Sequence, residues 1–150
     1  MKDLFFLDAN IIMYALGKEH PFKSPCRKYL EKIKKAEITV VTNTEVLQEI
    51  LHRYLSIRMP IIAEEAYSAI KIFCKEIYPV TLAEIEKAFA LLKEFPSINT
   101  RDAIHAATML NNGIEKILSA DPHFDMLPGI KRRVCDKKVG RIDFLFFWSY

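Results

Sequence analysis

The chain has 150 residues, of which 51% are hydrophobic and 27% are charged, and its formal net charge is +3. These values are typical of one folded domain and exclude a disordered chain, and no stretch reaches the roughly 20 apolar residues of a membrane-spanning helix. We therefore expect no membrane association. The three cysteines form no C-x-x-C pair, which favours reduced thiols and a cytoplasmic location.

The first predicted element is a strand at residues 3–8, in which "LFFL" is apolar on both faces, as in the centre of a parallel sheet. This strand ends abruptly at Asp8. A helix is predicted at about 10–17. Further on, Ser24 and Pro25 form an N-cap and N1 pair, which predicts the start of a second helix.

The next elements again alternate between strand and helix patterns. The run "EITVVT" predicts a strand at 37–42, and a helical pattern follows at about 44–58. A proline opens another predicted helix at about 60–76. The run "IYPVT" predicts a short strand at 77–81, and Pro79 within it indicates an edge strand.

A capping box, Thr81-x-x-Glu84, predicts the start of the next helix. Its expected inward face consists of Leu82, Ile85, Phe89 and Leu92. The last predicted elements are a helix that a glycine ends and two short strands, at about 100–112, 116–121 and 130–135. Strands alternating with helices predict parallel β-α-β units, and therefore an α/β protein with three layers, α/β/α.

Four acidic residues stand at the ends of predicted strands or in the first turns of helices, namely Asp8, Glu45, Asp102 and Asp121. Sheets of this class bind ligands at the carboxyl ends of their strands. Each acid also has a local interpretation. Glu45 can complete a capping box with Thr42. Asp102 can complement a helix dipole, and Asp8 and Asp121 can be turn residues.

Taken together, the four acids indicate a metal site. Converging carboxylates repel one another, and their pKa values rise unless a cation neutralises them. Carboxylate oxygens suit Mg²⁺ or Mn²⁺, and such an ion activates water and stabilises a transferring phosphoryl group. A phosphate ester is therefore the expected substrate. Glu84 has the local signature of Glu45 but is not expected in the site, because Pro79 places the preceding strand at the edge of the sheet.

Four segments of the chain resemble the motifs of the PIN-domain ribonucleases, and most of all the VapC-type toxins of toxin–antitoxin pairs. They are "FLDANIIMYAL", "TNTEVLQEIL", "NTRDAIHAATMLNNG" and "ILSADPHFDMLPGI". The resemblance extends from Leu4 to about Cys135. By position it implies that Asp8, Glu45, Asp102 and Asp121 are the catalytic, metal-binding acids. It also matches two supporting residues to the family pattern, Asn10 and Ser119, and matches Phe124 to the customary aromatic residue of the fourth motif.

The resemblance implies a Mg²⁺- or Mn²⁺-dependent endoribonuclease on a five-stranded parallel sheet with the first strand at its centre. It implies an RNA substrate, a homodimer and an antitoxin protein that inhibits the enzyme. On this interpretation residues 1–150 are a single PIN domain, and 136–150 are a C-terminal extension.

Several residues near the motifs have two open interpretations. Asp125 can be an outer acid of the site or a solvated loop residue, and Arg101 can contact a phosphate or only the solvent. His105 is expected to form hydrogen bonds within the core rather than bind metal. His123 can contact substrate or simply be exposed. The aromatic segment 143–150 is expected to pack back onto the domain, with a partner surface as the alternative.

Three other functions stay open at this point. The chain can be a PIN-domain RNA-processing nuclease that is not a toxin. It can be a PIN-like binding module without activity, although such modules typically lose acids that this chain retains. A phosphotransfer protein with an aspartyl nucleophile fits less well, because "LDANI" offers one acid where that chemistry needs an acid pair.

Overall fold

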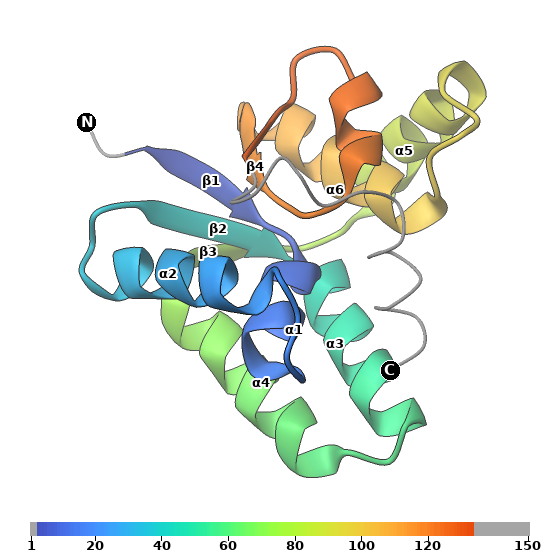
Figure 1. Ribbon diagram of the computed structural model, residues 1–150. Coiled ribbons are helices and arrows are strands. Elements are labelled where there is room, and N and C mark those ends of the chain that lie inside the picture. Colours follow the sequence, from blue (N-terminus) through green and yellow to red (C-terminus); the bar gives the residue numbers. More distant parts are fainter. Residues whose placement is uncertain (1–2, 134–150) are drawn as a thin grey trace.

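A parallel sheet of five strands forms the centre of the computed structural model, which describes residues 3–133 (Figure 1). The strand order is β3-β2-β1-β4-β5, and every neighbouring pair is parallel. The strands are β1 (Leu4–Leu7), β2 (Thr39–Asn43), β3 (Cys74–Tyr78), β4 (Lys116–Leu118) and β5 (Lys131–Arg133). The predicted five-stranded parallel sheet with the first strand at its centre is confirmed.

Helices cover both faces of this sheet, which gives the predicted three-layer α/β/α arrangement (Figure 1). One layer contains α1 (Ala9–Leu16), α2 (Lys23–Lys34), α3 (Thr44–Ser56) and α4 (Pro60–Phe73). The other contains α5 (Leu82–Glu94) and α6 (Thr100–Asn111), which pack against each other. A short 3-10 helix, Pro122–Met126, connects β4 to β5.

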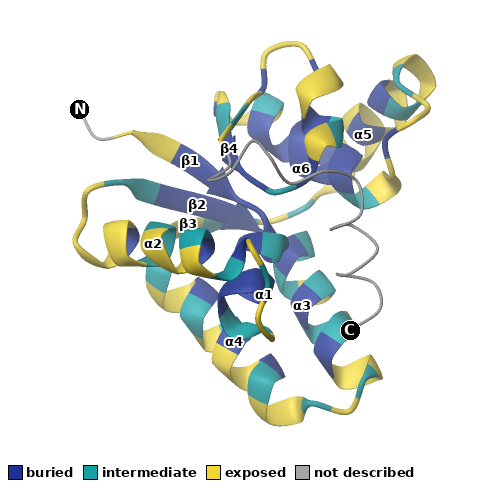
Figure 2. Cartoon of the chain, in the orientation of Figure 1, coloured by how far each residue is buried: buried dark blue, intermediate teal, exposed yellow. Residues whose placement is uncertain are grey.

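The central strand β1 is buried on both faces, as its apolar sequence predicts (Figure 2). Phe5 pairs with Val40 of β2, and Leu7 pairs with Leu118 of β4. Phe6 and Leu7 are completely buried. Because β2, β1 and β4 are adjacent and parallel, the residues that follow them meet at one edge of the sheet.

The boundary between α4 and β3 differs from the prediction. The helix predicted at 60–76 ends at Phe73, and the strand predicted at 77–81 begins at Cys74 and ends before Pro79. Pairing with β2, from Val40↔Cys74 to Asn43↔Tyr78, extends the strand over residues with good helical propensity. The predicted edge position of this strand is confirmed.

The start of α2 also differs from the prediction. The helix begins at Lys23, so Ser24 and Pro25 lie inside its first turn rather than at the N-cap and N1 positions. The N-cap is Phe22, which is buried and packs edge-on against Tyr14. Burial of this aromatic ring therefore fixes the start of the helix, and a proline is tolerated in a first turn.

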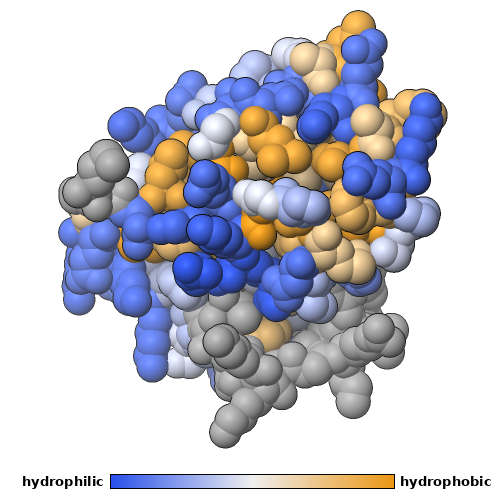
Figure 3. Space-filling model, turned by 90° about the horizontal axis from the view of Figure 1, so that it is seen from above, coloured by the Kyte–Doolittle hydropathy of each residue, from blue (hydrophilic) through white to orange (hydrophobic). Residues whose placement is uncertain are grey.

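The predicted inward face of α5 is wrong for three of its four residues, whereas the fourth, Leu92, is partly buried against the core. Leu82, Ile85 and Phe89 are exposed, whereas Glu84, Ala88 and Leu91 are buried. Alanines on both α5 and α6 allow the two helices to approach closely. Apolar side chains therefore reach the surface on this side of the molecule, seen as orange atoms between hydrophilic ones in Figure 3.

Two further predictions concern the ends of the chain and its environment. The predicted extension 136–150, with its aromatic segment 143–150, lies outside the described residues. Cys26 and Cys74 are buried thiols that form no disulfide within the described residues. Among residues 3–133, no helix combines the length and the apolar character that crossing a bilayer requires.

Candidate functional site

Asp8 is held by hydrogen bonds at the point where β1 passes into α1. Its backbone N–H donates to the Leu118 carbonyl at 3.1 Å, which extends the pairing of β1 with β4. Although Asp8 is the N-cap of α1, its carboxylate makes no capping hydrogen bond. Instead, Oδ2 accepts a 2.6 Å hydrogen bond from Ser119 Oγ and a 3.2 Å bond from Asn10 Nδ2. Asp8 as a whole residue is 4% exposed.

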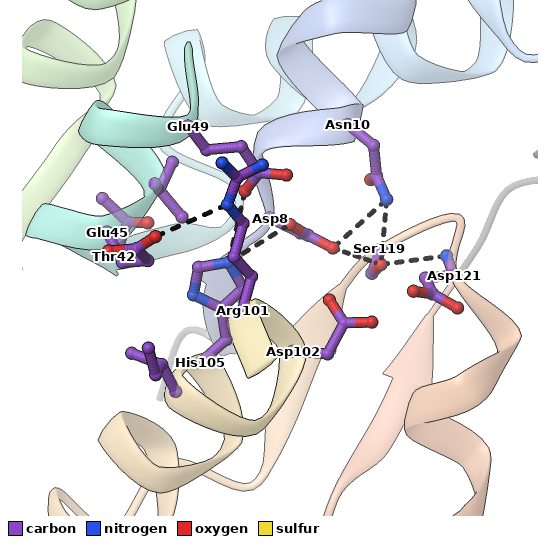
Figure 4. A network of polar contacts seen from close by, with 12 residues as sticks. Asp8, Asn10, Thr42, Glu45, Glu49, Arg101, Asp102, His105, Ser119 and Asp121 are labelled. Atoms are coloured by element: carbon purple, nitrogen blue, oxygen red, sulfur yellow. Dashed lines mark hydrogen bonds and ion pairs between the residues drawn. The ribbon is translucent and has the colours of Figure 1, made fainter. Parts of the chain in front are cut away.

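Ser119 and Asn10 connect the ends of β1 and β4 (Figure 4). Ser119 Oγ accepts hydrogen bonds from the Asp121 backbone N–H at 3.0 Å and from Asn10 Nδ2 at 3.2 Å. Asn10 Oδ1 accepts from the Ala120 N–H at 3.2 Å. Asn10 and Ser119, two of the supporting residues that the resemblance implies, therefore both contact Asp8.

Asp102 and Asp121 lie next to this network and are both buried. The N–H of Asp102 donates to the Asn99 side chain, the N-cap of α6, at 2.8 Å. Its own Oδ2 is buried and has no hydrogen-bond partner among the described residues. Asp121 begins the 3-10 helix, and its Oδ1 accepts from the His123 N–H at 2.9 Å and lies 2.7 Å from His123 Nδ1.

Glu45 lies outside this cluster of acids, and its local interpretation as a capping-box residue does not apply. The N-cap of α3 is Asn43, whose Oδ1 accepts from the Val46 N–H at 3.0 Å. Thr42 Oγ1 donates to the Leu7 carbonyl instead. The Glu45 carboxylate is 3.6 Å from Arg101 Nε.

Glu49, which was not among the predicted site residues, lies close to Asp8. Its Oε2 is 3.4 Å from His105 Nε2, and the same nitrogen is 3.9 Å from Asp8 Oδ1. Glu49 is four residues after Glu45, on the same face of α3. That helical spacing, within the motif "TNTEVLQEIL", is the sequence signal that could have identified it.

His105 is buried in the core, as expected, and its ring lies between Asp8 and Glu49 of α3. The Asn43 amide donates to Thr108 Oγ1 at 2.9 Å and faces His105 Nδ1 at 3.2 Å. Nδ1 is therefore the acceptor, and Nε2 directs its proton toward Glu49. Burial lowers the pKa of His105, but the Glu49 and Asp8 carboxylates outweigh this effect, and the pKa is raised.

Burial and mutual repulsion raise the pKa values of two of the acids. The pKa of Asp8 is raised to about 7, mainly by burial and also by the negative charge of Glu49. His105 and the hydrogen bond from Ser119 act in the opposite direction and lower it. The pKa of Asp102 is also raised, first by burial and then by the neighbouring Asp121 carboxyl group. The chain itself therefore supplies too little positive charge nearby to neutralise these two carboxylates.

The acids line a pocket of about 330 Å³. Its lining residues are Asp8, Asn10, Tyr14, Glu49, Asn99, Thr100, Arg101, Asp102, Ala120 and Asp121. Two sets of possible ligand atoms each lie within 4.8 Å of one another, Asp8–Glu49–His105 and Asp102–Asp121–His123. The unpartnered buried oxygen of Asp102 and the raised pKa values fit a divalent cation with oxygen ligands.

Asp125 and Phe124 do not line the pocket. Asp125 lies on the surface in a two-pronged ion pair with Arg132, with Nε to Oδ1 at 2.9 Å and Nη2 to Oδ2 at 2.8 Å. Phe124 is completely buried in the core. Glu84 forms the predicted capping box with Thr81 at the start of α5, away from the pocket lining.

A parallel sheet with acids gathered at the carboxyl ends of its central strands defines a class of α/β protein with an acidic site that could hold a metal ion. Within that class, the chain belongs to the PIN-domain family, because the sequence model of that family, the PIN domain, matches residues 5–130.

Relatives and solved structures agree with this assignment. The chain is 36% identical over 129 residues to the VapC ribonuclease Mb1869c of Mycobacterium bovis, covering 86% of this chain and 98% of the relative. It is 30% identical over 118 residues to ribonuclease VapC23 of Mycobacterium tuberculosis, covering 79% and 93%.

Among solved structures, VapC20 of Mycobacterium tuberculosis, a sarcin-ricin-loop-cleaving toxin, matches with a TM-score of 0.67 at 18% identity, covering 81% of this chain and 93% of that one. VapBC2 of Rickettsia felis bound to promoter DNA matches with a TM-score of 0.65 at 19% identity, covering 89% and 99%. These two likenesses support the fold.

Proposed function

We propose that the protein is a Mg²⁺- or Mn²⁺-dependent endoribonuclease that hydrolyses RNA phosphodiester bonds, and that it is the toxin of a toxin–antitoxin pair. The observation that carries this proposal is the pocket in which Asp8, Glu49, Asp102 and Asp121 converge. Relatives that match over nearly their whole length are named ribonucleases, which supports the same reaction.

The residues that would hold the ion are Asp8, Asp102, Asp121 and Glu49. A divalent ion bound there supplies a lowered pKa for a bound water and charge to stabilise the transferring phosphoryl group. The sequence motifs assign the second acid to Glu45. In the structure Glu49 rather than Glu45 lines the pocket, so we propose Glu49 in this role.

The remaining side chains orient these acids. Ser119 and Asn10 fix one oxygen of Asp8, and His105 lies between Asp8 and Glu49. The Glu49 side chain is 18% exposed, against 5% for Asp8. Glu49 is therefore the more accessible of the two, and we propose that it orients the attacking water and accepts its proton.

The test of the reaction is cleavage of a mixture of structured and single-stranded RNAs with Mg²⁺, with Mn²⁺ and with EDTA. Cleavage should need a divalent ion and should be lost in Asp102→Asn, which retains the shape of the side chain. The exposed Asp125→Asn is the matched control and should cleave like the parent. Metal-independent cleavage would contradict the proposed site, and a lack of cleavage of every RNA would contradict the function.

An antitoxin partner is proposed because solved structures similar to this chain include complexes named VapBC or toxin–antitoxin. Expression of the chain alone should stop growth, and co-expression of a short reading frame adjacent to its gene should restore it. Unaffected growth, with active nuclease in the extract, would instead indicate an RNA-processing enzyme. The homodimer stays a prediction, which light scattering can test.

A further inference from the structure

We propose that Arg101 binds a phosphate group of the RNA at the acidic pocket, and that Glu45 is the positioning residue that holds Arg101 there. This inference rests on the proposed nuclease function and adds to it a contact with the substrate. It also gives Glu45 a role different from the metal ligand that the sequence motifs imply.

Arg101 is the only basic side chain among the described residues that line the pocket, and the same lining includes carboxylates from three other segments, those of Asp8, Glu49 and Asp121 (Figure 4). Four acids repel an RNA backbone, so a substrate phosphate needs a positive group nearby. The Arg101 side chain is 31% exposed and therefore accessible to a ligand. Its place in the lining and its charge both suit a phosphate.

The position of Arg101 in its helix is not explained by helix stability. It lies in the first turn of α6, between Thr100 and Asp102. The amino terminus of a helix carries partial positive charge, so a cation in the first turn is unfavourable there. The same dipole and the arginine act together on an anion in the pocket, because both present positive charge to it.

The guanidinium group has donors available for a ligand. The distance of 3.6 Å from Nε to the Glu45 carboxylate fits an ion pair but is too long for a hydrogen bond. Within residues 3–133, Arg101 makes no hydrogen bond through its terminal amines. A guanidinium group with two free amines can bind phosphate oxygens in a two-pronged manner.

Glu45 fits a positioning role better than a structural one. Its side chain is 22% exposed and lies outside the pocket lining. An ion pair at this level of exposure contributes little to the stability of the fold. It does restrict the rotamers of a long side chain, which reduces the entropy that Arg101 loses when it binds a phosphate.

The first experiment measures binding of a short fluorescent single-stranded RNA to the full chain by anisotropy, in EDTA and across a series of salt concentrations. Arg101→Ala should weaken binding about tenfold and reduce the salt slope by about 0.7. Arg101→Lys should recover the slope but not the full affinity. Lys87→Ala removes one exposed charge from α5, which supplies no pocket residue, and should change neither value.

The second experiment tests Glu45 with Glu45→Gln, which keeps the shape of the side chain. This variant should bind RNA more weakly than the parent when Arg101 is present. In the Arg101→Ala background it should not weaken binding at all, because removal of an acid otherwise favours RNA. Calorimetric Mn²⁺ affinity should stay within about twofold of the parent, whereas Glu49→Gln should lower it.

Three results would overturn the proposal. They are Arg101→Ala binding RNA as tightly as the parent, no binding by the parent itself, and a loss of Mn²⁺ affinity in Glu45→Gln as large as in Glu49→Gln. Failure of the nuclease function would appear separately, as a lack of cleavage by the parent in Mg²⁺ and Mn²⁺, because the binding assay contains no metal.

Discussion

Replacement of Asp8 by Asn should stabilise the metal-free protein while abolishing cleavage. Asp8 is buried at the end of the central strand, with Glu49 and Asp121 as the acidic neighbours that raise its pKa. An asparagine at this position keeps the shape and an oxygen that can accept the bonds from Ser119 and Asn10. It removes the charge that burial disfavours.

The size of the effect follows from the raised pKa. The pKa of Asp8 rises from 3.8 to about 7, so ionisation costs the folded state up to about 4 kcal/mol relative to the unfolded chain. Below pH 3.8 the carboxyl group is protonated in both states, and the cost is absent. It grows as the pH rises and is complete above pH 7. We therefore expect Asp8→Asn to be more stable than the parent by about 1 to 4 kcal/mol at pH 8.

The assay is urea unfolding followed by circular dichroism, in EDTA, at pH 4, 6 and 8. The advantage of Asp8→Asn should be largest at pH 8 and close to zero at pH 4. Asp125→Asn, which alters an exposed ion pair with Arg132, should show no such rise with pH. A variant less stable than the parent at pH 8, or an advantage independent of pH, would refute the electrostatic reasoning.

Three other substitutions distinguish residues that act in the site from residues that stabilise the surrounding fold. Ser119→Ala removes the donor to Asp8, so we expect at least tenfold slower RNA cleavage in gel assays and a loss of about 1 to 2 kcal/mol in urea unfolding. Asn43→Ala removes the N-cap of α3 and the contact to His105, and should lower the free energy of unfolding by about 2 to 3 kcal/mol. Glu84→Ala breaks the capping box of α5, and should cost about 1 kcal/mol in thermal unfolding with unchanged cleavage.

The central part of the fold could be predicted from the sequence because its local signals agree with its packing. The apolar run before Asp8 marks the strand that is buried on both faces. Gly113, with φ of +70°, ends α6 in the left-handed region that glycine favours. The proximity of Asp8, Asp102 and Asp121 could be predicted from the sequence, because parallel strands place their carboxyl ends at one edge of the sheet.

The other features of the fold and of the site depend on tertiary contacts, which no local sequence pattern predicts. The face that α5 buries is set by close packing on α6, which favours Ala88 over the larger Phe89. Glu45 and Glu49 share a helix face, and only their distance from Arg101 and His105 separates their roles. The sequence has the same capping pattern at Thr42 as at Thr81, but the side chain that caps α3 is that of Asn43.

The same burial that builds the sheet makes the metal-free site unfavourable. Apolar strands exclude water from Asp8, and α6 does the same for Asp102, so both carboxyl groups have raised pKa values. Any cation that binds the folded site but not the unfolded chain recovers this lost stability, by about 2.7 kcal/mol at a concentration one hundred times its Kd. The acids thus reduce the stability of the empty fold, and the cation affinity that we propose for the site arises from the same buried charge.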